Sequence, residues 1–133
     1  MVLVLAALSG AACQSRYGKF LRQHVDYPPT STLPPHRYCE IMLVRRQVTV
    51  QGQPCKNFNS FVHAPAAQLV AACSQTPDAA GFYSTPNTMN ITACRLRTRN
   101  SWPPCNYRAQ QLQHHVRVAC INGLPVHLQN TYP

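Results

Sequence analysis

The amino-acid sequence predicts an α+β protein with an antiparallel sheet. Segments with helical character lead the chain and segments with strand character dominate its second half, an order typical of this class. The 133 residues fit one domain. Six of the seven cysteines lie in the part of the chain expected to fold, and an even number in a small chain indicates three disulfides.

Three short helices are expected. The first covers Tyr17–Val25, where Phe20 and His24 stand four residues apart and share one face. Four prolines between residues 28 and 35 end this helix and form a stiff connector. The second covers Tyr38–Arg46, whose last turn carries two arginines, as the helix dipole favours. The third covers Pro65–Ser74, which starts with proline and is rich in alanine.

The remaining segments favour strands, because apolar and polar side chains alternate along the first of them and β-forming residues recur in the others. The strand candidates are Asn57–His63, Met89–Leu96, Tyr107–Leu112, His115–Ile121 and Pro125–Leu128. Thr76–Asn87 contains two prolines and one glycine, so an exposed loop is expected there.

The first residues are expected to be a secretory signal peptide. Met1–Leu8 is uniformly apolar, and the five residues that follow are small, as at a cleavage site. A signal at residues 1–13 leaves one domain at 14–133, and cleavage after Ala12 fits almost as well. The basic residues that usually start a signal peptide are missing, which indicates that the signal is truncated. The alternative to a signal peptide is a buried N-terminal strand or helix. A signal that contains Cys13 leaves six cysteines and predicts a secreted, extracellular protein.

The chain is strongly basic, with 12 Lys or Arg against 3 Asp or Glu and a formal net charge of +9 at pH 7. This charge favours a polyanionic partner: RNA, DNA, a heparan-type glycan or an anionic membrane. The alternative is a solvated basic surface that only aids solubility. Three acidic residues are too few for a calcium cage or a paired-carboxylate glycosidase site. No apolar stretch is long enough to span a membrane, and no glycine-rich nucleotide motif is present.

Three short sequence motifs contain a His or Lys that could take part in catalysis. They are FLRQH at Phe20–His24, CKNFNSF at Cys55–Phe61 and PVH at Pro125–His127. Through these motifs the chain resembles the pancreatic-type (RNase A) ribonuclease superfamily, whose signature is CK-x-x-N-[ST]-F. The likeness extends to Tyr38-Cys39, Asn90–Cys94, Pro103–Tyr107 and Val116–Cys120. Ser15–Tyr17, Trp102–Ala109 and Asn122–Leu128 are similar to the angiogenin-like and non-mammalian branch.

The resemblance implies an RNase A-like fold, with three short helices on a curved antiparallel sheet. It also implies the disulfides Cys39–Cys94, Cys55–Cys105 and Cys73–Cys120, whereas spacing alone leaves all 15 pairings open. The pancreatic enzymes have eight cysteines. The absent fourth bridge would lie in the loop between Cys73 and Cys94, which helps those enzymes to bind the second base.

The activity implied by the resemblance is that of a metal-independent endoribonuclease without a cofactor. The RNA 2′-hydroxyl attacks its own phosphate, which requires a base, an acid and a cation to stabilise the developing charge. Two histidines suit the first two roles near neutral pH. By resemblance His24 is the base, His127 the acid and Lys56 the cation. The expected substrate-binding residues are Gln23, Asn59, Ser60 and Leu128.

Several positions differ from the family pattern and predict catalysis weaker than that of a digestive enzyme. Ser60 replaces the usual threonine of the pyrimidine site, but its hydroxyl still suits uracil and cytosine. Gln129 stands where an aspartate usually orients the acid histidine. Leu128 replaces a phenylalanine of the pocket wall, and Asn130 lies near the position of a pocket-obstructing glutamine in the angiogenin-like branch.

Two hypotheses from different functional classes stay open. The first is a secreted, pyrimidine-preferring endoribonuclease that acts on RNA. The second is a cationic host-defence or angiogenin-like signalling protein that acts mainly by binding anionic glycans, bacterial membranes or receptors. A monomer and an interaction with a ribonuclease inhibitor are also expected. His63 is assigned to structure, and zinc at His114 and His115 is disfavoured because Cys120 is needed for a bridge.

Overall fold

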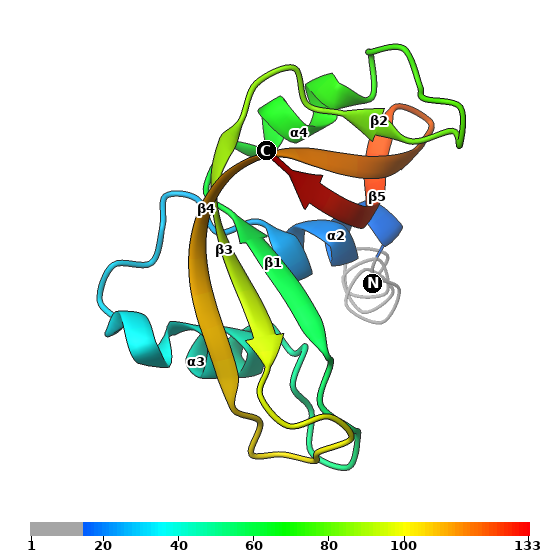
Figure 1. Ribbon diagram of the computed structural model, residues 1–133. Helices are drawn as coiled ribbons and strands as arrows, with labels where there is room; N and C mark the ends of the chain where they lie inside the picture. Colours follow the sequence, from blue (N-terminus) through cyan, green and yellow to red (C-terminus); the bar gives the residue numbers. More distant parts are fainter. Residues whose placement is uncertain (1–14) are drawn as a thin grey trace, which may run out of the picture.

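The computed structural model describes residues 15–133, so the predicted signal peptide at residues 1–13 lies outside the described residues. The predicted α+β class is confirmed. Among residues 15–133, no helix is long and apolar enough to cross a membrane. The elements in chain order are α2 (Arg16–His24), the 3₁₀ helix η1 (Pro35–Arg37), α3 (Tyr38–Arg45), β1 (Phe58–Val62), α4 (Ala66–Ala72), β2 (Tyr83–Ser84), β3 (Met89–Leu96), β4 (Tyr107–Ile121) and β5 (Leu124–Tyr132) (Figure 1).

The sheet is antiparallel and is organised around β4. Its strand order is β1-β3-β4-β2, and β5 also pairs with β4. Residues 107–114 of β4 pair with β3, whereas residues 115–121 pair with β5. Register shifts between Arg117 and Val118 and between Ala119 and Cys120 accompany the change of partner. Figure 1 shows the resulting curve of β4, which links the two halves of the molecule.

Three predictions about the strands are wrong in detail. The predicted strand Pro125–Leu128 is too short, because β5 continues to Tyr132. Tyr107–Leu112 and His115–Ile121 are not separate strands, because both belong to the continuous β4 and only the pairing partner changes between them. The predicted loop Thr76–Asn87 contains the short strand β2, which pairs with Arg117 and Val118. Thr85 in this segment is buried, and its hydroxyl accepts a hydrogen bond from the Val116 amide. A two-residue strand is too short to produce a readable alternation.

The three predicted helices are all present within one or two residues of their expected ends. The α2 helix begins after Ser15, whose side chain accepts a hydrogen bond from the Gly18 amide as an N-cap. Phe20 and His24 are the buried residues of this helix, as their spacing predicts. The helix therefore presents His24 toward the sheet rather than toward solvent.

The core consists of two buried clusters, and the three disulfides have the expected pairing. The first cluster surrounds α3 and contains Cys39–Cys94 and Cys55–Cys105. The second cluster is formed by residues of α2, α4, β1, β3 and β4. Cys73–Cys120 lies beside it and joins the end of α4 to β4. Each native bridge in a small domain stabilises the fold by about 2–5 kcal/mol. The bridges offset part of the charge repulsion within a chain of net charge +9.

Candidate active site

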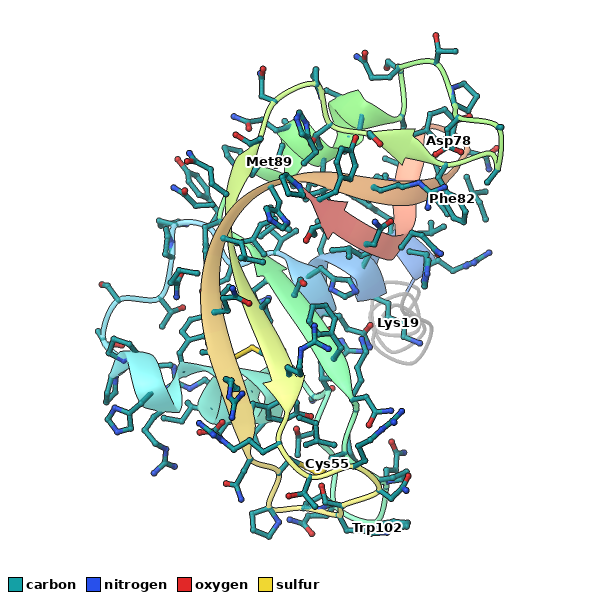
Figure 2. All side chains as sticks on the ribbon, viewed as in Figure 1. Lys19, Cys55, Asp78, Phe82, Met89 and Trp102 are labelled. Atoms are coloured by element: carbon teal, nitrogen blue, oxygen red, sulfur yellow. A yellow bond between two sulfur atoms is a disulfide. The ribbon has the colours of Figure 1, made fainter. Side chains whose placement is uncertain are left out.

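A cleft of about 740 Å³ lies between α2, β1 and β5. It contains every residue that the sequence predicted for catalysis or substrate binding: Gln23, His24, Lys56, Asn59, Ser60, His127 and Leu128. These residues come from three separate regions of the chain. Packing of α2 against both β1 and β5 brings them together. In Figure 2, Lys19 projects from α2, which forms one side of the cleft.

His24 is held in a defined orientation at the buried end of α2. Its side chain is only 7% exposed, and its ring lies against Phe20 with the centroids 5.3 Å apart. The Nδ1 atom lies 3.0 Å from the backbone oxygen of Ser60. A carbonyl oxygen only accepts, so Nδ1 carries the proton and donates it. This tautomer leaves the lone pair of Nε2 available as a proton acceptor.

The surroundings of His24 favour its neutral form. Burial lowers its pKa to about 4, and the positive charges of Lys56 and His127 act in the same direction. The hydrogen bond to Ser60 opposes this shift, but it is the smaller effect. At neutral pH the imidazole is therefore uncharged and able to accept a proton.

Lys56 is positioned by a chain of hydrogen bonds along the same wall. Its Nζ atom donates to Oδ1 of Asn59 at 2.8 Å. Nδ2 of Asn59 in turn donates to the backbone oxygen of Gln23 at 3.0 Å. Burial lowers the pKa of Lys56, and the charge of Lys19 lowers it further. The buried amide of Asn59 thus connects the lysine on one segment to the end of α2.

The opposite wall is the exposed edge strand β5. His127 is exposed, and its Nε2 atom lies 3.2 Å from Oε1 of Gln129. An amide oxygen accepts, so Nε2 donates this hydrogen bond and Nδ1 is the other protonation site. Oδ1 of Asn130 accepts a hydrogen bond from Arg117 at 3.4 Å. The neutral amide of Gln129 orients the ring, as an aspartate would, without adding a negative charge.

Ser60 provides an unused hydrogen-bonding group in the cleft. The residue is 1% exposed, and its Oγ atom has no hydrogen-bond partner within residues 15–133. An unpartnered buried hydroxyl costs free energy, so a bound ligand that satisfies it gains affinity. Asn130, expected near a pocket-obstructing position, makes no hydrogen bond to the Ser60 hydroxyl, and its amide oxygen accepts from Arg117.

A network of charged side chains stabilises the C-terminal end of α2. Arg46 donates to the backbone oxygens of Val25 at 2.7 Å and Arg22 at 2.9 Å, and to the Asp26 carboxylate at 3.3 Å. Burial alone would raise the pKa of Asp26, but hydrogen bonds from Tyr38 and Thr30 and the Arg46 charge lower it overall. The network fixes the carbonyl end of α2, where His24 is the last residue.

Three histidines outside the cleft have structural contacts. His63 lies 2.9 Å from the backbone oxygen of Asp26 through Nδ1 and 2.8 Å from the Thr92 hydroxyl through Nε2, as its structural assignment predicts. His114 is hydrogen-bonded to the Thr131 hydroxyl, and the His115 ring stacks on Tyr132. Between residues 15 and 133, no group of three potential metal ligands is clustered.

Several cleft residues were missed by the sequence analysis. Arg16 and Lys19 line the cleft beside Gln23, and their spacing of three and four residues along α2 is a signal that identifies a shared face. Arg95 also lines the cleft, with its guanidinium 4.8 Å from the centre of the Phe58 ring. Phe58 and Arg95 are partners across β1 and β3, a relation that depends on strand register and is not readable from either segment alone.

The cleft is strongly electropositive. Within the described chain its lining contains two arginines and two lysines but no acidic residue. All three acidic residues are engaged elsewhere: Asp26 with Tyr38, Glu40 with the Tyr107 amide and Asp78 with Arg117. A neutral imidazole, a second imidazole and an ammonium in such a cleft define an acid–base site for an anionic phosphodiester.

Comparisons with known proteins agree with this class of site. The family model described as Pancreatic ribonuclease matches residues 15–129. Ribonuclease CL2 of Gallus gallus is 63% identical over 119 residues, which cover 90% of this chain and 98% of the relative. Angiogenin of Gallus gallus is 41% identical over 133 residues, covering 98% and 93%. The crystal structure of green turtle egg white ribonuclease has a TM-score of 0.83 at 39% identity, covering 90% and 100%.

The chain therefore belongs to the pancreatic ribonuclease family, in its angiogenin-like branch. Its fold is the RNase A-like α+β fold with three disulfides. It is a metal-independent endoribonuclease of the pancreatic type.

Proposed function

We propose that this endoribonuclease prefers pyrimidines and cleaves RNA by attack of the 2′-hydroxyl on the adjacent phosphorus. The bond from phosphorus to the 5′-oxygen breaks, and the product is a 2′,3′-cyclic phosphate that water hydrolyses later. The observation that carries the proposal is the joint lining of one basic cleft by His24, Lys56 and His127. The other two cavities described within residues 15–133 contain no lysine.

His24 is the proposed general base. Its hydrogen bond to the Ser60 carbonyl keeps the proton on Nδ1, so Nε2 is free to take the proton of the 2′-hydroxyl. The lowered pKa keeps the ring neutral at physiological pH. A ring that starts neutral accepts the proton without first losing one to solvent.

His127 is the proposed general acid. Gln129 holds Nε2, so the proton for the departing 5′-oxygen comes from Nδ1. In the hydrolysis of the cyclic phosphate the two histidines exchange roles: His127 activates water and His24 protonates the 2′-oxygen. Because Gln129 is neutral, it stabilises the imidazolium less than a carboxylate does, which supports a reduced activity. Gln129→Asp is expected to raise kcat about threefold, and an unchanged or lower kcat contradicts this explanation.

Lys56 is the proposed electrostatic stabiliser. Its ammonium is aimed by Asn59 and neutralises the charge that accumulates on the phosphoryl oxygens in the transition state. Gln23 and the backbone amide of Leu128 are the proposed additional donors to the phosphate. Both line the cleft beside the histidines.

Pyrimidine preference is proposed to depend on Ser60. Its buried, unpartnered hydroxyl can donate to cytosine N3 or accept from uracil N3–H, so either base satisfies it. We expect cleavage of poly(C) and poly(U) but little cleavage of poly(A). Ser60→Ala is expected to lower kcat/KM for pyrimidine substrates about tenfold. Equal cleavage of all three polymers by purified protein contradicts the preference.

The catalytic assignment is tested with tRNA and a pyrimidine dinucleotide. His24→Ala and His127→Ala are each expected to lower kcat by about 10²–10⁴-fold. His114→Ala is the matched control, because this histidine does not line the cleft in the described structure. Cleavage by both variants at the wild-type rate, or no cleavage by the pure wild-type protein, would contradict the proposal.

Secretion is proposed on two grounds. The three disulfides suit an oxidising compartment, and the apolar segment Met1–Leu8 followed by small residues suits a signal peptide cleaved near residue 13. Expression in secretory cells is expected to release a chain that begins at Cys13 or Gln14, as measured by mass spectrometry. Retention of the full chain inside the cell contradicts it.

A role through anionic surfaces is the second candidate, favoured by the net charge of +9. The partners in that case are anionic glycans or bacterial membranes. For either role, a ribonuclease inhibitor is a further proposed partner, and the protein is proposed to act as a monomer. The discriminating sample is the double variant His24→Ala/His127→Ala. If it kills bacteria as well as wild type, the binding role stands apart from catalysis; if killing disappears, the binding role is wrong.

A further inference from the structure

Arg117 links a loop outside the cleft to one of the cleft residues. In the loop, Oδ1 of Asp78 accepts hydrogen bonds from the amides of Ala80 and Phe82. Oδ2 of Asp78 accepts from Nε of Arg117 at 2.8 Å, and the guanidinium lies 4.4 Å from the centre of the Phe82 ring. Figure 2 shows Asp78 and Phe82 together at the end of the molecule that carries β2 and β5. These two contacts fix the direction of the Arg117 side chain.

The remaining end of this guanidinium contacts Asn130. Nη1 of Arg117 lies 3.4 Å from Oδ1 of Asn130, its register partner across β4 and β5. A guanidinium has only donors, so it selects the oxygen end of the amide. Asn130 also lines the cleft that contains Ser60. With Oδ1 committed to Arg117, the polar group that Asn130 offers to the cleft is the Nδ2 donor.

We propose that Arg117 is a positioning residue that makes the base site favour uracil over cytosine by fixing the Asn130 amide as a donor. This inference rests on the proposed binding of a pyrimidine in the cleft. Uracil carries carbonyl acceptors at both C2 and C4, whereas cytosine has a donor amino group at C4. With N3 of either base paired to the Ser60 hydroxyl, a fixed N–H donor has two carbonyl acceptors left on uracil but only one on cytosine. The Ser60 hydroxyl suits both bases, so the discrimination depends on Asn130.

The test measures equilibrium binding of 3′-UMP and 3′-CMP by calorimetry, which requires no cleavage. Wild type is expected to bind 3′-UMP about fivefold more tightly than 3′-CMP, the value of about one neutral hydrogen bond. Arg117→Met allows the Asn130 amide to rotate and is expected to bring the ratio close to one. In an Asn130→Ala background, Arg117→Met is expected to leave the ratio unchanged. A merely structural role for Arg117 would not follow this pattern, because both nucleotides would be affected alike.

Two further variants serve as a reversal experiment and as a charge control. Asn130→Asp keeps the pairing with Arg117 but offers an acceptor to the cleft, so the preference is expected to reverse toward 3′-CMP. Arg99→Met removes one positive charge from an exposed loop that does not line the described cleft, and it is expected to leave the ratio as in wild type. Circular dichroism of each variant verifies that it is folded.

The inference is wrong if Arg117→Met and Asn130→Asp leave the ratio at the wild-type value, if Arg117→Met changes it equally in the Asn130→Ala background, or if neither nucleotide binds. Failure of catalysis is a separate result. If wild type binds both nucleotides with the expected ratios but cleaves no RNA, the proposed function fails and the role of Arg117 stands. If RNA is cleaved through His24 and His127 but the ratio does not respond, only the inference fails.

Discussion

The two walls of the cleft are built in different ways. The wall formed by α2 and β1 is buried and hydrogen-bonded: His24 is 7% exposed, and Asn59 and Ser60 are each 1% exposed. The wall formed by β5 is an exposed edge strand, on which His127 depends on Gln129 for its orientation. Folding itself therefore fixes His24, the proposed general base. On the β5 wall, a few local contacts that single substitutions can change determine the orientation of His127, the proposed acid, and of Asn130.

After the two histidine substitutions, the largest effect is expected from removing the charge of Lys56 on the buried wall. Lys56→Gln should lower kcat by about 10²–10³-fold, because the phosphoryl charge loses its nearest ammonium. Lys56→Arg keeps the charge with a different shape and should retain an intermediate rate. Steady-state cleavage of a dinucleotide measures both. Equal losses in the two variants would show that shape rather than charge is decisive, against the assignment made above.

Removing the Arg46 contacts behind the same wall should lower the stability of the fold. Arg46→Met leaves the Asp26 carboxylate with one partner fewer and removes the donors to Val25 and Arg22, so the free energy of unfolding should fall by about 3 kcal/mol. Urea denaturation measures this. The matched change at the exposed Arg117–Asp78 pair, Arg117→Met, should leave the midpoint close to wild type, because solvent screens that pair. Equal midpoints for the two variants would contradict the contrast between the walls.

The burial of His24 also makes stability depend on pH. The pKa of His24 is about 4 in the folded protein and about 6.5 in the unfolded chain, so between these values the unfolded state binds the extra proton. Stability is therefore complete above pH 6.5 and is lost as the pH falls toward 4, by an amount on the order of 3 kcal/mol. Asp26, whose pKa is lowered, adds a loss in the same direction at more acidic pH. His24→Asn should flatten the curve between pH 6.5 and 4, and an unchanged slope would show that another group is responsible.

The smallest effect is expected on the exposed wall. Gln129→Ala should lower kcat about threefold to tenfold, because His127 keeps its place on β5 but loses one orienting hydrogen bond. Because both the folded core and the base are untouched, the unfolding midpoint and the acidic side of the pH–rate profile should stay as in wild type. A decrease in kcat as large as that of Lys56→Gln would contradict the contrast, because the orientation of His127 on β5 would then matter as much as the Lys56 charge.

The same contrast explains what the sequence could predict. Helical spacing identified the buried face with Phe20 and His24, and the short motifs identified the three residues proposed for catalysis, because these signals are local. The disulfide pairing was available only from resemblance, since spacing allows many pairings. The Phe58–Arg95 contact and the link from Arg117 to Asn130 depend on strand register and on β4 changing its partner, neither of which a single segment encodes.

The most direct test of the central claim is the pH dependence of kcat/KM on a pyrimidine dinucleotide for wild type, His24→Ala and His127→Ala. The account predicts a bell-shaped profile whose acidic side falls near pH 4, where His24 becomes protonated, and a different side of the bell lost in each variant. A profile that keeps both sides in the two variants would contradict the assignment of His24 and His127 as base and acid.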